Sequence, residues 1–235
     1  MNILAFETSG RAASVAVMKD KRIIGEMTVS TKLNHSEKLM PMIDELLEKT
    51  EISIKDIDAL AVGVGPGSFT GIRIGVSTAK GLALALDIPI AAVSSLRALA
   101  YNGIYSDMLV CPIIDARRNQ VYSGVFRWEA AELVEVLNED VYNFKELLFV
   151  LKNRNCPILF LGEDAYKFKE QMKEVLGENG ILAMPQANFP RAAAVAGMAI
   201  KKIDEKDLEN AFTLMPVYLR KAEAERQYEE RMKKK

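Results

Sequence analysis

The chain has 235 residues, of which 49% are apolar and 27% are charged. This much apolar side chain can bury a core, so the composition excludes a chain that is disordered over most of its length. Lysine and arginine number 31 against 32 aspartates and glutamates, a net charge of -1, which excludes a strongly basic protein that binds nucleic acid alone through its phosphates. One basic patch within a larger RNA-binding assembly is compatible with this charge.

The residues that metal sites and nucleophilic catalysis use are few. Cys111 and Cys156 are the only cysteines, and His35 is the only histidine. Two cysteines form neither a disulfide framework nor a four-cysteine zinc site. One histidine excludes a two-histidine metal site and restricts a Ser-His-Asp triad to His35. We therefore predict no metal site, reduced cysteines, and a histidine at the surface or at an interface.

The sequence shows no targeting or membrane-spanning segment. Met1 leads directly into an apolar stretch with no basic region before it. Residues 59–86 are the least charged stretch, and their continuous part after Gly71 is shorter than the roughly 20 apolar residues of a membrane span. We expect a cytoplasmic protein that does not enter a membrane.

The chain begins with three short apolar segments, at residues 3–7, 13–18 and 22–30, separated by tight polar turns. Short strands with tight connections predict an antiparallel meander. The first turn carries Glu7, Thr8 and Ser9, whose carboxylate and hydroxyls suit a phosphate or a metal as well as a plain polar turn.

A helix is predicted next because five apolar residues recur at i, i+3, i+4, i+7 and i+8 and fall on one face. These residues are Leu39, Met42, Ile43, Leu46 and Leu47. Ser36 is the predicted N-cap. Since Pro41 would lose a backbone hydrogen bond inside a helix, we expect the regular helix to begin near Met40.

A glycine-rich turn joins a buried strand at residues 59–64 to a helix at residues 71–86. A glycine loop before a helix can bind an anion, but Pro66 breaks the dinucleotide pattern and the Gly-Lys-Ser/Thr ending of a P-loop is absent. The favoured interpretation is a sharp turn with close packing.

The helix at residues 71–86 is apolar or small nearly all round, so we predict that it is buried on all sides. Gly71, Gly75 and Ala79 form a stripe that allows close backbone approach, and Ser68 or Thr70 is the predicted cap.

The same order of elements recurs in the second half. Strands are predicted at residues 109–115, 121–127, 133–138 and 158–162, and helices at 144–152, 165–176 and 191–203. Three strands, a helix, a strand and a helix therefore occur twice, which indicates a duplicated α/β unit. We place one lobe at residues 1–95, a second at 96–220, and a charged tail at 221–235.

Five motifs together resemble the bacterial TsaB family over essentially the whole chain. They are ILAFETS, NHSEKLMPMIDELL, VGVGPGSFTGIRIGVSTAKGLALA, IDARRNQVYSGVF and PVYLRKAEAE. The resemblance implies the duplicated fold of actin, hexokinase and the Hsp70 ATPase domain. In that α/β fold each RNase H-like lobe is a mixed five-stranded sheet with helices.

The resemblance also implies a role. The family is a non-catalytic paralogue of TsaD, the catalytic subunit that makes N6-threonylcarbamoyladenosine beside the tRNA anticodon. It implies that the chain binds TsaD and, with the ATPase TsaE, supports transfer of the threonylcarbamoyl group. It further implies a homodimer when alone, contact with tRNA only within the complex, and no cofactor.

Residues that differ from TsaD support a non-catalytic role. Ser95 and Leu99 stand where TsaD has two histidines, and Arg191 matches its aspartate. Serine, leucine and arginine do not replace imidazoles and a carboxylate on a transition metal. Asp115 opens the second phosphate loop, whose glycines are replaced by bulky side chains. We expect Asp115 to form a vestigial nucleotide loop together with Glu7, Thr8 and Ser9.

Apolar surface that remains exposed once a core is built marks the binding site of a protein partner. The resemblance implies that the helix with the Leu39 to Leu47 stripe and the helix at residues 71–86 mediate both the homodimer and the TsaD contact. The expected interface comprises His35, Leu39, Met42, Ile43, Leu46, Leu47, Phe69, Ile72, Arg73, Val76 and Lys80. The alternative that both helices are simply core stays open.

Other functions fit less well. A small ATP-dependent phosphotransferase or acyltransferase would use Glu7, Thr8 and Asp115 around a magnesium nucleotide. A metallopeptidase of the His-Glu-x-x-His type cannot be built with one histidine. An RNA-binding module is disfavoured by the balanced charge, although some basic residues would suit tRNA phosphates within a complex. They are Arg117, Arg118, Lys233, Lys234 and Lys235.

Overall fold

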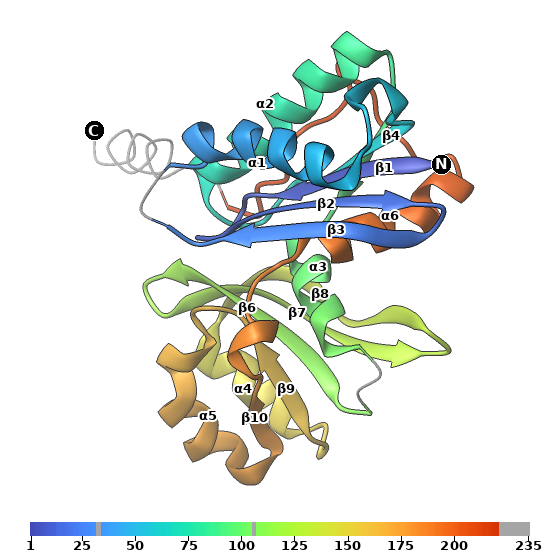
Figure 1. The fold of residues 1–235 in the computed structure, drawn as a ribbon. Coiled ribbons are helices and arrows are strands. Elements are labelled where there is room, and N and C mark those ends of the chain that lie inside the picture. Colours follow the sequence, from blue (N-terminus) through green and yellow to red (C-terminus); the bar gives the residue numbers. More distant parts are fainter. Residues whose placement is uncertain (32–33, 105–106, 221–235) are drawn as a thin grey trace.

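The computed structural model describes residues 1–31, 34–104 and 107–220, which fold into two lobes, each built around a five-stranded sheet (Figure 1). The first sheet has the order β3-β2-β1-β4-β5, in which β2 is antiparallel to its neighbours and β4 and β5 run parallel to β1. Its strands are β1 (Asn2–Glu7), β2 (Ala13–Lys19), β3 (Arg22–Val29), β4 (Ala59–Gly63) and β5 (Ile90–Val93). The predicted meander is confirmed.

The second sheet repeats this topology, with the order β10-β9-β6-β7-β8. Its strands are β6 (Leu109–Arg117), β7 (Gln120–Glu129), β8 (Glu132–Asn143), β9 (Ile158–Leu161) and β10 (Gly180–Leu182). Each central strand pairs with an antiparallel neighbour on one side and a parallel one on the other. The duplicated unit and the mixed five-stranded sheets predicted from the sequence are confirmed.

Helices cover the sheets. The α-helices are α1 (His35–Thr50), α2 (Phe69–Leu86), α3 (Ser95–Ala100), α4 (Phe144–Lys152), α5 (Lys169–Leu176) and α6 (Ala192–Asp204). The 3-10 helices are η1 (Ile54–Asp56), η2 (Tyr101–Gly103), η3 (Ala165–Phe168), η4 (Gly177–Asn179) and η5 (Pro185–Ala187). Helices α1 and α2 pack on one face of the first sheet and α6 packs on the other (Figure 1). Within the described residues, no helix has both the length and the apolar character needed to cross a membrane.

Each lobe contributes one helix that packs on the sheet of the other lobe. Helix α3 follows the first sheet but packs on β6 and β7, whereas α6 follows the second sheet but packs on β1, β2, β4 and β5. The chain after α6 also returns to the first lobe, where Leu214 is fully buried among its core residues. The expected second lobe of residues 96–220 therefore contains a segment that packs with the first. The tail at 221–235 lies outside the described residues.

Helix α1 begins earlier than predicted. It starts at His35 with Asn34 at its N-cap, so the expected start near Met40 and the expected cap at Ser36 are wrong. Pro41 lies inside the helix on its exposed face, and Glu37, four residues before it, is exposed as well. Water can therefore bond the carbonyl that the proline leaves unpaired, which makes the proline tolerable here.

Helix α2 is buried along one side only, which corrects the prediction of burial all round. Phe69, Arg73 and Leu84 are exposed, while the predicted stripe of small residues faces the sheet. Ser68 is the cap, since its Oγ accepts a hydrogen bond from the Gly71 N–H at 3.2 Å.

The stripe brings α2 against the turn that follows β1. A Cβ added to Gly71 would lie 2.1 Å from the Thr8 carbonyl oxygen, and one added to Gly75 would lie 2.5 Å from Thr8 Oγ1. Real side chains do not approach backbone oxygen this closely. The glycines therefore serve close packing, as the favoured interpretation predicted.

Two substitutions in this one helix test the packing. Gly71→Ala should lower the free energy of unfolding by about 2 kcal/mol or more, because the new methyl group clashes with backbone. Gly81→Ala is the matched control: its Cβ meets nothing within 4 Å, so the variant should gain about 0.5–1 kcal/mol from helix propensity. Urea unfolding followed by circular dichroism measures both. Equal effects in the two variants would contradict the packing account.

Candidate functional site

A cleft of about 1090 Å³ lies between the lobes. The turn after β1 and the glycine loop before α2 form its first wall, and the β6–β7 turn and the turn after β9 form its second. Residues 217–220 of the C-terminal segment complete its lining. The cleft therefore brings together the sequence regions predicted to hold a vestigial nucleotide site.

Glu7, two residues before the cleft residue Ser9, is fully buried. Its carboxylate accepts hydrogen bonds from the Ser9 N–H at 2.6 Å and from Ser95 Oγ at 2.7 Å. Ser95 Oγ in turn accepts the Gly65 N–H at 3.2 Å. Burial raises the pKa of Glu7, and these hydrogen bonds oppose the shift. The carboxylate thus joins β1, α3 and the loop before α2.

The neighbours of Glu7 are also engaged in the fold. Thr8 Oγ1 donates to the Gly71 carbonyl at 2.7 Å, and the Ser9 carbonyl accepts the Ser68 N–H at 2.8 Å. Ser9 Oγ is buried and has no hydrogen-bond partner among the described residues, and Ser9 lines the cleft. Of the residues predicted for a vestigial nucleotide loop, Ser9 and Asp115 line the cleft, whereas Glu7 and Thr8 do not.

Asp115 is paired within its own lobe. Lys167 Nζ lies 2.8 Å from its carboxylate, and the Arg117 N–H donates to it at 2.7 Å. Partial burial pushes the pKa of Asp115 upward, but these hydrogen bonds and the nearby positive charges outweigh burial and hold it below its usual value. Arg117, Arg118 and Asn119 all have positive φ (64°, 54° and 58°), so the turn is tight and carries bulky side chains.

A salt bridge crosses the cleft. Arg11, in the turn after β1, lies 3.6 Å from the Glu163 carboxylate and 3.2 Å from that of Asp164, both in the turn after β9. Burial raises the pKa of Glu163, and the Arg11 charge opposes that rise. Within the part of the chain that the structure describes, one oxygen of Glu163 is buried without a hydrogen-bond partner. The cleft is therefore lined by a positive charge from the first lobe, Arg11, and by charges of both signs from the second lobe.

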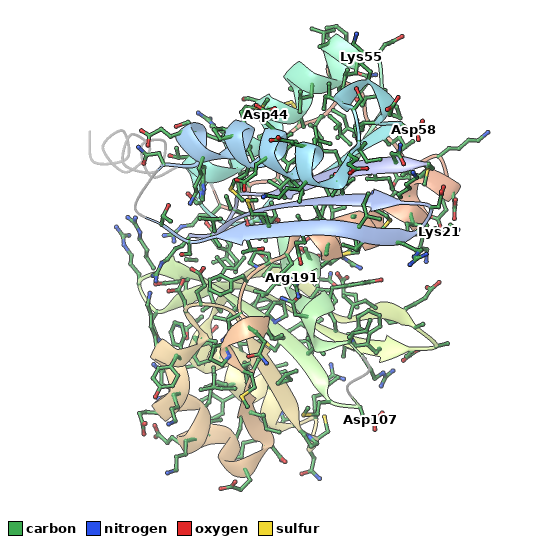
Figure 2. All side chains as sticks on the ribbon, in the orientation of Figure 1. Lys21, Asp44, Lys55, Asp58, Asp107 and Arg191 are labelled. Carbon is green, nitrogen blue, oxygen red and sulfur yellow. The ribbon has the colours of Figure 1, made fainter. Side chains whose placement is uncertain are left out.

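The positions that the resemblance aligns with catalytic residues of TsaD, Ser95, Leu99 and Arg191, have structural contacts. Ser95 is bonded to Glu7, and Leu99 is 1% exposed in a cluster that includes Phe126. Arg191, labelled in Figure 2, pairs with Glu26 of β3. Among residues 1–31, 34–104 and 107–220, no three histidine, cysteine, aspartate or glutamate side chains are placed to hold a metal ion together.

Most residues of the predicted partner interface lie in the core of the first lobe. The side chains with at most 7% exposure are Leu39, Met42, Ile43, Leu46, Leu47, Ile72 and Val76. Phe69 and Arg73 are exposed, and His35 and Lys80 are partly buried. The apolar stripe that predicted α1 thus packs α1 on its own sheet, as the alternative left open in the sequence analysis stated.

A groove of about 480 Å³ nevertheless lies between α1 and α2. Its lining residues are Ser36, Leu39, Met40, Phe69, Thr70, Arg73, Ile74, Ser77 and Thr78. Met40 and Phe69 are 40% and 38% exposed. Met40 and Ile74 were not among the predicted interface residues, because Met40 is out of phase with the buried stripe and α2 shows no polar face to mark its orientation.

An aromatic cluster lies at one end of this groove. The Arg73 guanidinium lies 3.8 Å from the centre of the Phe69 ring, and Tyr218 stacks on Phe69 with ring centres 5.0 Å apart. Arg73 Nε also donates to Tyr218 Oη at 2.9 Å. Phe69 lines both the groove and the cleft, so the cluster lies between them.

His35 lies at the edge of the cleft. Its Nε2 is 2.9 Å from the Gly10 carbonyl oxygen, and its buried Nδ1 has no hydrogen-bond partner in residues 1–31, 34–104 and 107–220. Burial lowers the pKa of His35, although the Gly10 carbonyl opposes the shift. The histidine therefore fixes the start of α1 to the turn after β1, and it lines the cleft and not the groove.

The buried carboxylate of Glu7 should make stability depend on pH. Because its pKa is raised in the folded state, that state binds more protons than the unfolded chain above the ordinary glutamate pKa. The free energy of unfolding should then fall as the pH rises through the raised pKa, by up to about 1.4 kcal/mol per pH unit. Glu7→Gln should lose this slope in urea unfolding measured from pH 4.5 to 8.

Glu48→Gln, which removes an exposed carboxyl from α1, is the matched control for Glu7→Gln. If the two variants differ from the parent chain by the same amount at every pH, burial of Glu7 is not the source of the dependence.

Comparison with known proteins connects these features to a family. A family model described as TsaD, tRNA N6-adenosine threonylcarbamoyltransferase, matches residues 22–228. The tRNA threonylcarbamoyladenosine biosynthesis protein TsaB of Bacillus subtilis is 39% identical over 233 residues, covering 99% of this chain and 100% of the relative. The TsaB protein of Haemophilus influenzae is 34% identical and covers 94% of each chain.

Solved structures agree on the fold. The structure of YeaZ from Pseudomonas aeruginosa is similar with a TM-score of 0.78 and 28% identity, over 92% of this chain and 99% of that one. Component A of the Acidaminococcus fermentans (R)-2-hydroxyglutaryl-CoA dehydratase is similar with a TM-score of 0.53 at 16% identity, over 87% and 99%, and shares the fold alone. The expected duplicated, actin- and hexokinase-like fold is confirmed. With its whole length matched at 39% identity, the chain belongs to the TsaB family, which is related to TsaD.

Proposed function

We propose that this chain acts in tRNA threonylcarbamoyladenosine biosynthesis as a non-catalytic subunit that binds TsaD. The observation that carries the pathway is the full-length match to proteins named for it. The mode of action is the finer part of the proposal, and it rests on the contacts made by individual residues.

The non-catalytic role is supported by what occupies the matched catalytic positions. Ser95 holds a buried carboxylate, Leu99 fills a core, and Arg191 is paired with Glu26. Each side chain is committed to the fold, and none is a ligand type for a transition metal. The reacting groups would then belong to TsaD, and this chain would supply a surface.

The groove between α1 and α2 is the surface that suits such a partner. It is bordered by exposed apolar side chains of Met40 and Phe69, and Arg73 adds a charged group beside the ring. Apolar and aromatic side chains together with arginine are enriched at the centres of protein interfaces. A second copy of the chain would use the same face around a two-fold axis, so a homodimer and the TsaD complex should compete.

The alternative, an ATP-dependent phosphotransferase or acyltransferase, rests on the cleft. Its support is weaker, because Glu7 and Thr8 are buried and do not line the cleft, and Lys167 is paired with Asp115. TsaE and tRNA would join through the complex, and Arg117 and Arg118, two of the basic residues that line the cleft, would contact tRNA phosphates. A cytoplasmic location remains a prediction.

An omission experiment tests the role. Purified TsaC, TsaD and TsaE, with tRNA, threonine, bicarbonate and ATP, should form threonylcarbamoyladenosine only when this chain is added. Nucleoside analysis of the tRNA measures the product. Equal product with and without the chain would contradict the proposed function, and nucleotide binding by the isolated chain would then be the next measurement.

Two methionines test the docking surface. Met40→Glu places a charge beside the groove and should weaken TsaD binding about tenfold or more, and it should also weaken the homodimer. Met184→Glu is the matched control, because Met184 is 69% exposed and lies after β10 in the second lobe. Calorimetry measures the affinity. Met42 is unsuitable, since at 5% exposure a glutamate there would unfold the chain.

An unchanged affinity for Met40→Glu, or an equal loss for both methionine variants, would contradict docking at the groove.

A further inference from the structure

Residues 217–220, which we name the strap, connect the two lobes beside the cleft. The Val217 N–H donates to the Val64 carbonyl of the first lobe at 2.8 Å. Arg220 Nη1 donates to the Ala116 carbonyl of the second lobe at 2.6 Å. All four residues of the strap line the cleft. The strap is therefore hydrogen-bonded to both lobes at one side of the cleft.

Few contacts hold the strap in place. Besides these two hydrogen bonds, its main attachment is Tyr218, which stacks on Phe69 and accepts a hydrogen bond from Arg73. Val217 and Tyr218 remain 44% and 40% exposed, and Leu219 and Arg220 are only partly buried. A segment without a fully buried side chain should open locally at a small fraction of the free energy of global unfolding.

The groove between α1 and α2 shares its residues with this attachment. Phe69 and Arg73 line the groove and are also the two side chains that hold Tyr218. A partner seated in the groove would touch both side chains, cover the exposed edge of the stack and restrict the motion of Phe69. Anything that stabilises Phe69 and Arg73 in this arrangement also stabilises Tyr218 against them.

We propose that docking of a partner protein in the α1–α2 groove fixes the strap in place beside the cleft, through the cluster of Phe69, Arg73 and Tyr218. The inference rests on the proposed function for the identity of the partner, TsaD. It adds a regulated element: the bound partner stabilises the strap and, through it, the connection between the two lobes beside the cleft. Coupling between two equilibria is reciprocal. The factor by which docking favours the attached strap is therefore also the factor by which the attached strap raises the affinity for the partner.

Hydrogen exchange in the full chain tests the coupling, with Val217 as the reporter because its amide is bonded to Val64. Addition of TsaD should slow exchange in residues 214–220 by about fivefold or more. In the free chain, Tyr218→Ala should accelerate exchange at Val217 and should weaken TsaD binding about fivefold. The matched control is Tyr166→Ala, because Tyr166 is 70% exposed on the second lobe and should change neither quantity.

The outcomes separate the inference from the proposed function. If TsaD protects the first turn of α2 but leaves residues 214–220 unchanged, docking occurs without the strap, and the inference alone is overturned. If Tyr218→Ala leaves exchange at Val217 unchanged in the free chain, the stack does not hold the strap, and the inference is overturned again. If TsaD protects no part of the chain, the proposed function fails and the coupling fails with it.

Discussion

The close approach of α2 to the turn after β1 is the contact on which the rest of the first lobe depends. Gly71 and Gly75 let the helix lie directly against Thr8, and the Thr8 hydroxyl bonds the Gly71 carbonyl. Next to this contact, Glu7 ties Ser95 to the end of β1. A side chain at either glycine would push α2 away from the sheet. The ring of Phe69 and the wall of the groove that α2 forms would move with it.

The buried Glu7 carboxylate adds a second constraint at the same place. It has hydrogen-bond donors but no cationic partner among the contacts described, so its desolvation is offset only in part. Such a group costs stability that an apolar residue would not. What it contributes is connection, because its partner Ser95 begins α3, the helix that packs on the other lobe.

The exchange of α3 and α6 makes the two lobes mutually dependent. Helix α3 comes from the first half and packs on the second sheet, whereas α6 comes from the second half and packs on the first sheet. Neither half therefore contains all the elements that cover its own sheet. The C-terminal segment adds to this through Leu214, which completes the first core. The cleft is therefore bounded by elements from both ends of the chain, and the strap beside it is attached to α2, the helix that also forms the groove.

The sequence by itself determined the duplication, the family and the order of most strands and helices, although not α3 or β10, because periodicity, turn residues and motifs are local properties of the chain. It also determined that Gly71 and Gly75 serve close packing, since small residues at helical spacing have that consequence on any sheet.

The tertiary structure alone decided which apolar residues face outward. Leu39 and Met42 share a stripe with a clear period, yet that period is the same for a core and for an interface, and only the position of the sheet shows that they are buried. Contacts between distant segments, such as Tyr218 with Phe69 and Arg11 with Glu163, carry no local pattern, so the cleft, the groove and the strap became visible only in the fold.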